Sequence, residues 1–240
     1  MLDFREFMNL GERNYELPLL RRIDKNGRFY HVVQRASNRD NIYDVDLAKY
    51  RENVLCRICA MYNVVILFSV VLTNHTHDIL VANNWEDIAT VIRLVNAAVS
   101  HKIRKKNPKR YANGRRVFET TPFYRAIHDM VALYVVSKYT FDNVKNVVLS
   151  KGFVPFSCFW YMENGTLTKP YDKRNYETLF GMSVMELYKL FNENDMGTVR
   201  QFALDRYANW TQTDTDRLFK VDSSKSWINQ DLEWDISLKT

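Results

Sequence analysis

Residues 64–82, VVILFSVVLTNHTHDILVA, contain two apolar runs separated by a short polar segment. The first run, residues 64–72, is continuous and rich in β-branched side chains, a composition typical of a strand that is central in a sheet or covered on both faces. Thr73–Thr76 predicts a turn, and residues 77–82 predict a second strand. We therefore expect two successive strands that lie in a sheet and are joined by a polar turn.

The segments around this pair predict the rest of the architecture. Residues 29–35 (FYHVVQR) are β-branched and aromatic and predict an earlier strand. Apolar residues recur at helical spacing over 47–58 and again over 88–99. Residues 121–151 predict one or two further helices, and the aromatic segment 153–161 predicts another strand. This order fits an α+β fold, a ferredoxin-like β-α-β-β-α-β sandwich with an antiparallel sheet.

The chain divides into three parts by composition. Residues 1–26 are mixed and predict an N-terminal extension, and residues 27–161 hold the predicted sandwich. Beyond these, the sequence is more polar, and Ser183 with Glu186 forms a capping box ahead of an apolar helical stripe. We therefore expect residues 162–240 to form a C-terminal, mostly helical extension.

The overall composition excludes several classes of protein. The chain has 240 residues, of which 46% are hydrophobic, so a sizeable core can form. Its longest apolar run has nine residues, against roughly 20 needed to cross a bilayer. The N-terminus lacks the hydrophobic region of a signal peptide, so we expect a cytoplasmic protein. Three cysteines cannot build a disulfide framework, and glycine-rich phosphate loops and other hydrolase motifs are missing.

Positive charge is concentrated in one segment. Lysine and arginine number 34 against 28 acids, for a formal charge of +6. A basic cluster without acids comprises Lys102, Arg104, Lys105, Lys106, Lys109, Arg110, Arg115 and Arg116. Such a cluster suits a nucleic-acid backbone, because neutralised phosphates release counterions. A solvated helix end followed by a loop explains the same charges equally well.

Two histidines stand where the second strand begins. Side chains alternate between the faces of a strand, so His75 and His77 should point the same way. Two such imidazoles can bind one divalent cation and leave positions open for a third ligand and a phosphate oxygen. Polar residues that merely end a strand are the alternative interpretation.

These residues also resemble a known family. Tyr30–Arg35, Asn38-Arg39 and Asn74–His77 followed by Ile79–Val81 are similar to motifs of REP-associated tyrosine transposases. These belong to the single-tyrosine transposases of the HUH endonuclease superfamily. Thr73 replaces the proline that is usual there. The resemblance implies that residues 27–161 form an HUH-type catalytic domain.

The family requires a nucleophilic tyrosine on a helix, in the pattern Tyr-x-x-x-Asn-Pro. Tyr139 and Asn143 match it, with Val144 in place of proline, and their spacing puts both on one helix face. Tyr134 is the competing nucleophile, although the residue four positions after it is Lys138, which cannot bind a metal while charged.

The resemblance implies a metal-dependent single-stranded DNA endonuclease and strand transferase. Tyr139 would form a covalent 5′-phosphotyrosine intermediate with single-stranded or hairpin DNA. His75, His77 and Asn143 would hold Mg²⁺ or Mn²⁺, which suit mixed imidazole and oxygen ligands. A decayed or domesticated single-stranded nucleic-acid-binding protein on the same scaffold is the alternative.

The expected DNA contacts lie in two segments. The basic cluster would hold backbone phosphates, and Tyr111 could stack unpaired bases. After the first strand, Gln34, Arg35 and Arg39 either touch DNA or form an ordinary solvated loop. A monomer and a homodimer, with the tyrosine serving its own or a partner's histidines, both remain open. The protein would lie at the nucleoid when bound to DNA.

Overall fold

The computed structural model describes residues 28–151, 156–157, 173–211 and 214. Within them, five strands form one sheet in the order β4-β1-β3-β2-β5, and every neighbouring pair is antiparallel. The strands are β1 (Phe29–Arg35), β2 (Val65–Val71), β3 (His75–Val81), β4 (Phe123–Ile127) and β5 (Phe156–Ser157). The first four follow the ferredoxin-like order, so the predicted fold class is confirmed.

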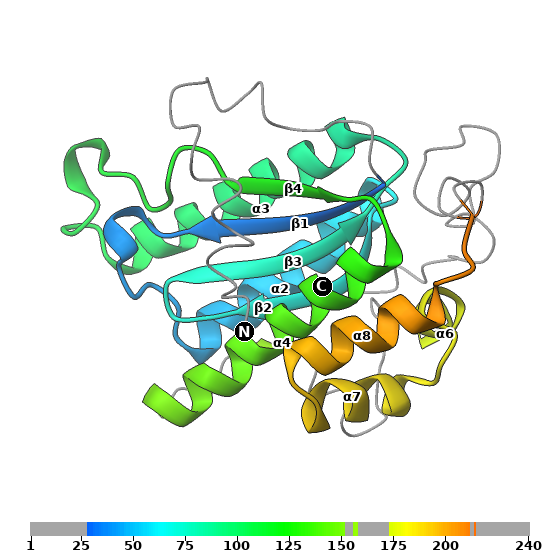
Figure 1. Cartoon of the computed structure of the whole chain (residues 1–240). Helices are drawn as coiled ribbons and strands as arrows, with labels where there is room; N and C mark the ends of the chain where they lie inside the picture. Colours follow the sequence, from blue (N-terminus) through cyan, green and yellow to red (C-terminus); the bar gives the residue numbers. More distant parts are fainter. Residues whose placement is uncertain (1–27, 152–155, 158–172, 212–213, 215–240) are drawn as a thin grey trace, which may run out of the picture.

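Helices cover both faces of this sheet (Figure 1). Helices α2 (Val45–Met61) and α3 (Trp85–Lys106) lie on one face, and α4 (Met130–Lys151) lies across the other. Three shorter helices follow, α6 (Lys173–Phe180), α7 (Val184–Glu193) and α8 (Met196–Arg206), and α8 packs beside α4. Helix α4 therefore lies between the sheet and the C-terminal helices.

The fourth strand of the sandwich is not where the sequence predicted it. We expected helix from residue 121 onward, but residues 123–127 form β4, an edge strand paired with β1. The segment has only five residues, most of them half-exposed, so it lacks the alternation that identifies a strand. Pairing with β1 decides its conformation, which is a tertiary effect.

The strand predicted over 153–161 is described only in part. Within that range Phe156–Ser157 form β5, which adds a fifth strand beside β2 rather than closing the sandwich. The remainder of the range lies outside the described residues. So do the predicted extension 1–26 and most of 212–240, and the predicted boundaries at 26 and 161 stay predictions.

A closed polar network fixes the central strands on the α2 side. Arg51 donates to Asp78 of β3 at 2.9 Å and to Ser69 of β2 at 3.0 Å, and Ser69 donates to Glu52 at 2.9 Å. All four residues are buried. Because each charge has a charged or hydrogen-bonding partner, the network can be buried without an unpaired ion. It anchors α2 to the strand that carries both histidines.

The C-terminal helices are held to the sandwich by aromatic residues. Tyr134 of α4 donates from its hydroxyl to the carbonyl of Phe180 at 3.1 Å, and the hydroxyl of Tyr176 donates to the carbonyl of Leu67 in β2. The predicted capping box is present, with Ser183 and Glu186 each bonded to the other's backbone. Among the described helices, none is long and apolar enough to cross a membrane.

Candidate active site and nucleic-acid contacts

The two histidines of β3 lie side by side on the face covered by α4. Their ring centroids are 4.9 Å apart, and the rings meet edge to face. His75 is half-buried at the strand start, whereas His77 is 2% exposed. Strand alternation places them together, as the sequence predicted, and puts Asp78 and its network on the opposite face.

A neighbouring amide orients the first imidazole. The Nδ1 of His75 lies 2.6 Å from Oδ1 of Asn74, while Nδ2 of Asn74 donates to the carbonyl of Arg39 at 3.3 Å. An amide oxygen only accepts, so His75 donates from Nδ1. In the neutral ring the lone pair then lies on Nε2, which is the form that binds a cation.

The turn that holds this amide is conformationally unusual. Asn38 and Arg39 both have positive φ, 58° and 56°, a conformation that asparagine tolerates better than arginine does. The turn is tied down because Ile42 and Tyr43 both donate their backbone N–H to the carbonyl of Thr73 at 2.9 Å. Strain of this kind persists where surrounding contacts fix it, and here it aims Asn74 at His75.

A third histidine orients the second imidazole, and sequence reasoning missed it. His31 of β1 places Nε2 3.0 Å from Nδ1 of His77, with the rings stacked at 5.2 Å and 9°. One nitrogen must donate and the other accept. If His77 donates, its Nε2 carries a lone pair, and that atom is buried without a hydrogen-bond partner among the described residues.

His31 could have been found from strand pairing. It stands opposite Ile79, two residues along β3 from His77, and its side chain shares the face of both β3 histidines. Two facts together identify His31 as a site residue: side chains of β1 alternate between the faces of the sheet, and the register pairs β1 with β3 so that His31 lies next to the β3 histidines. The register depends on contacts between distant residues, and the sequence did not reveal it.

Burial keeps the two inner imidazoles neutral. The pKa of His31 falls to about 3, first because burial disfavours its charged form and then because Arg125 lies nearby. The pKa of His77 is held well below its usual value by burial, with His31, His75 and Arg35 adding to the effect. Both rings thus stay neutral, and when His31 accepts the hydrogen bond that they share, the lone pair on Nε2 of His77 is left to bind a cation.

Tyr139 lies over this histidine group. Its ring centroid is 5.5 Å from that of His77 and 6.4 Å from that of His31, both in edge-to-face contact. Asn143, one turn further along α4, donates from Nδ2 to the carbonyl of Tyr139 at 3.0 Å. Its Oδ1 makes no hydrogen bond within the described part of the chain, and no described contact joins it to a histidine.

Tyr134 lies on another side of the same helix. It is five residues before Tyr139, about 140° away around the helix. The side chain is fully buried, its hydroxyl donates to Phe180, and its ring packs on Phe180 and Phe202. Burial raises the pKa of this phenol above its ordinary value. Its environment is that of a packing residue.

The side chains present fit a divalent cation with open coordination positions. Within the described residues, no group of three or more His, Cys, Asp or Glu side chains is arranged to hold a metal. The candidate set is instead two imidazoles and an amide oxygen, and His77 contributes an orphaned buried acceptor. A site of this kind leaves room for oxygen atoms of a substrate.

The expected DNA contacts after β1 divide between the two faces. Arg35 is exposed and stands directly opposite His75 in the sheet, on the face of the histidines. Arg39 is exposed in the turn beside Asn74. Gln34 is buried on the other face, where its Oε1 accepts from Nδ2 of Asn96 at 2.7 Å. Gln34 thus lies in the interior and not on the surface where a DNA contact was expected.

The basic cluster also divides in two. Some of its members are paired: Lys106 with Asp44 at 2.6 Å, Arg110 with Asp40 at 2.9 Å, and Arg115 with Asp40 at 3.2 Å. Lys102 places its ammonium 3.8 Å from the centroid of the Tyr50 ring. The exposed side chains of Arg104, Lys105, Lys109 and Arg116 form no ion pair within the described residues.

Tyr111 is only 7% exposed, so the prediction that it stacks bases is wrong.

A family model matches about half of this chain. Residues 25–143 match the family model described as "Transposase IS200 like". No curated protein matches this chain. Among solved structures, the REP-associated tyrosine transposase bound to a REP hairpin is 16% identical, with 62% of this chain and 87% of that one covered and a TM-score of 0.45. A presumed transposase from Deinococcus radiodurans R1 is 13% identical over 50% and 92% of the two chains, with a TM-score of 0.37.

Proposed function

This chain belongs to the IS200-like transposase family, and on that premise we propose that it cleaves and rejoins single-stranded DNA through Tyr139. The family membership supports DNA processing by a transposase-like enzyme in general. The observation that carries the specific proposal is the placement of the Tyr139 ring over His77, whose Nε2 is buried and without a hydrogen-bond partner among the described residues.

The chemical step is attack of the tyrosine oxygen on a backbone phosphorus. The phenol loses its proton, its oxygen bonds to phosphorus, and the bond from phosphorus to the 3′ oxygen breaks. The leaving oxygen takes up a proton and becomes a 3′-hydroxyl, while the 5′ phosphate stays on Tyr139. A 3′-hydroxyl of another strand can reverse the step, because the phosphotyrosine ester keeps the bond energy.

His75, His77 and Asn143 would hold Mg²⁺ or Mn²⁺. Such a cation, when bound, would neutralise a phosphate oxygen and polarise phosphorus. The chain's own contribution is orientation: Asn74 fixes the ring of His75, and His31 fixes the ring of His77. These hydrogen-bond partners fix the orientation of both rings before any ligand arrives.

Two exposed groups at the edge of this face suit the DNA strand. Arg35 stands beside His75 and presents a guanidinium fork that matches phosphate. Phe123 of β4 is 43% exposed, although it is a large apolar residue, and its ring meets His31 edge to face at 6.5 Å. An exposed aromatic ring beside a reactive site is a platform on which an unpaired base can stack.

The test is formation of a covalent adduct between protein and a matching single-stranded or hairpin oligonucleotide with Mg²⁺ or Mn²⁺. We expect the wild-type protein and Tyr134→Phe to form it and Tyr139→Phe to form none. Equal adduct in wild type and Tyr139→Phe would show that the nucleophile is misassigned. Loss in Tyr134→Phe alone would transfer the role to that residue.

The second candidate function is a single-stranded DNA-binding protein that has lost cleavage. Two observations favour it: Thr73 and Val144 replace the prolines of the motifs that this chain resembles, and His77 is nearly sealed from solvent. Binding that is indifferent to chelator, with no product at any metal concentration, would support it. A cleavage product that disappears with EDTA would exclude it.

A further inference from the structure

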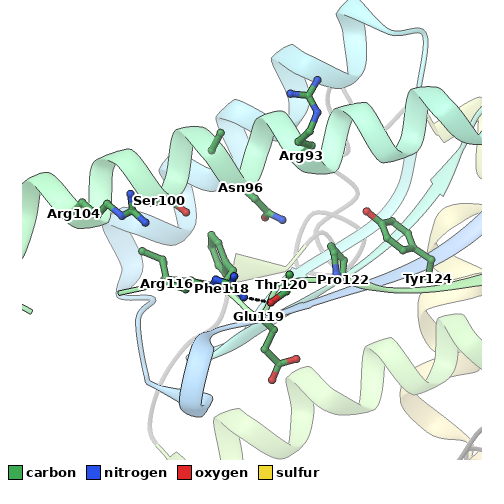
Figure 2. A pocket seen from close by; sticks show the side chains of 12 residues that line it. Arg93, Asn96, Ser100, Arg104, Arg116, Phe118, Glu119, Thr120, Pro122 and Tyr124 are labelled. Carbon is green, nitrogen blue, oxygen red and sulfur yellow. Dashed lines mark hydrogen bonds between the residues drawn. The ribbon is translucent and has the colours of Figure 1, made fainter. Parts of the chain in front are cut away.

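A groove lies on the opposite side of the sheet edge from the histidines. It runs between α3 and residues 116–124, the segment that leads into β4 (Figure 2). Its volume is about 440 Å³, within the range of small-ligand sites. The groove is distinct from the candidate active site, because α3 covers the other face of the sheet from α4.

The groove is positively charged. Arg104 of α3 and Arg116 of the facing segment line it from both sides. Arg93, three turns before Arg104, also belongs to the lining, although its guanidinium points away from residues 116–124 in Figure 2. Arg116 donates to the hydroxyl of Thr120, and Arg104 donates to the carbonyl of Arg115 at 3.5 Å, so neither contact neutralises charge. The side chain of Glu119 points away from α3 in Figure 2. No carboxylate of the described residues pairs with these arginines.

The α3 wall of the groove also offers a fixed hydrogen-bond acceptor. Nε2 of Gln34 donates to the carbonyls of Arg35 at 3.0 Å and Glu119 at 3.5 Å, so its Oε1 must accept from Nδ2 of Asn96. This orientation leaves Oδ1 of Asn96 as an acceptor in the lining, with no hydrogen bond to another described residue. Tyr124 adds a half-buried aromatic ring to the same lining.

These groups match the parts of a nucleotide. Arginine forks bind phosphate, an aromatic ring stacks on a base, and a fixed amide oxygen accepts from the exocyclic amine of a base. We propose that the groove binds an unpaired nucleotide of the DNA strand on which the enzyme acts. This inference rests on the proposed function for the identity of the strand, and on the groove's own chemistry for the site.

The groove and the histidines share one stretch of backbone. Residues 117–119 continue the ladder of β1: Phe118 bridges Ala36, Ser37 donates to the carbonyl of Val117 at 2.9 Å, and Glu119 donates to that of Arg35 at 2.9 Å. Arg35 in turn stands opposite His75. A strand of DNA that crosses this edge of the sheet can therefore occupy the groove and the candidate active site together.

The experiment measures binding of a fluorescent mixed-sequence single-stranded oligonucleotide by anisotropy in EDTA, where cleavage is absent. We expect Arg104→Gln and Arg116→Gln each to weaken binding roughly three- to tenfold and to lower the salt slope by about one. Arg200→Gln is the matched control, because Arg200 is exposed on α8 away from the groove. The control should bind like the wild type.

Base identity provides the second measurement. An acceptor at Asn96 predicts tighter binding of oligo(dA) or oligo(dC) than of oligo(dT), whose base lacks an exocyclic amine, and Asn96→Ser should reduce that preference. Unchanged affinity and salt slope in both arginine variants would overturn the groove as a subsite. Failure of the wild-type protein to form an adduct would instead overturn the proposed function and leave these binding results standing.

Discussion

The charged network under α2 and the histidine pair under α4 satisfy their hydrogen-bonding groups to different extents. On the α2 side, Arg51, Asp78, Ser69 and Glu52 satisfy one another within a closed network. On the α4 side, His31 and His77 share one hydrogen bond and leave Nε2 of His77 without a partner among the described residues. A satisfied network stabilises a fold, whereas an unsatisfied buried acceptor costs free energy. The charged network stabilises the packing of α2 on β3, whereas the unsatisfied nitrogen of His77 is the position at which the proposed cation would bind.

The largest expected effect is a loss of stability when the charged network on the α2 side is broken. Asp78→Asn removes the charge that pairs most closely with Arg51 and leaves that guanidinium only the longer contact to Glu52 at 3.7 Å, so we expect the free energy of unfolding to fall by about 3–5 kcal/mol. Urea denaturation followed by circular dichroism measures it. A loss well under about 1 kcal/mol would show that this network is not what anchors α2 to β3.

Substitutions at the histidines on the α4 side should change cation binding more than they change stability. His31→Phe keeps a stacked ring but removes the acceptor for Nδ1 of His77, so we expect Mn²⁺ affinity to fall about 10–100-fold. His31→Gln is the matched control, because its amide oxygen can accept the same hydrogen bond. Titration followed by electron paramagnetic resonance measures Mn²⁺ binding without any DNA.

Two results would contradict this role of His31. If His31→Phe and His31→Gln weaken Mn²⁺ equally, His31 acts by its imidazole and not by accepting one hydrogen bond. If neither weakens it, His77 does not bind the cation in the orientation that this bond fixes. The free energy of unfolding should change by less than about 1–2 kcal/mol in both variants, unlike that of Asp78→Asn.

The sequence predicted those features that depend on residues close together in the chain, and missed those that depend on residues far apart. Strand alternation placed His75 and His77 together, and helical spacing placed Tyr139 and Asn143 on one side of α4, because both patterns are local. His31, the groove at Arg104 and Arg116, and the edge strand at Phe123 all depend on pairing between β1 and β4 or on packing against α3. Those contacts join residues far apart in sequence, and no local pattern specifies them.

The basic cluster shows the same limit. Composition identified Arg110, Arg115 and Arg116 as equivalent charges, but Asp40 pairs with the first two and not with the third. Asp40 lies in the turn after β1, about 70 positions away in sequence. Tyr111 likewise looked available for stacking, and only the fold shows that its ring is buried.

A smaller effect, on DNA binding, is expected at Phe123, whose aromatic ring is exposed on the same face as the histidines. Phe123→Leu preserves apolar character but removes the stacking surface, and we expect single-stranded DNA binding to weaken about five- to tenfold. Phe123→Tyr is the control, because it keeps an aromatic ring at an exposed position. Anisotropy in EDTA measures both. Equal affinity of the Leu and Tyr variants would exclude stacking at this position.

The smallest effect concerns the tyrosine that the structure places among packing residues. Tyr134→Phe deletes a hydroxyl that donates to the buried carbonyl of Phe180, so we expect the free energy of unfolding to fall by about 1 kcal/mol. Adduct formation should be retained, because Tyr134 lies on another side of α4 from the histidines. Urea denaturation and the adduct assay on one preparation separate the two effects. A variant that unfolds like the wild type but forms no adduct would contradict the assignment of Tyr134 to packing.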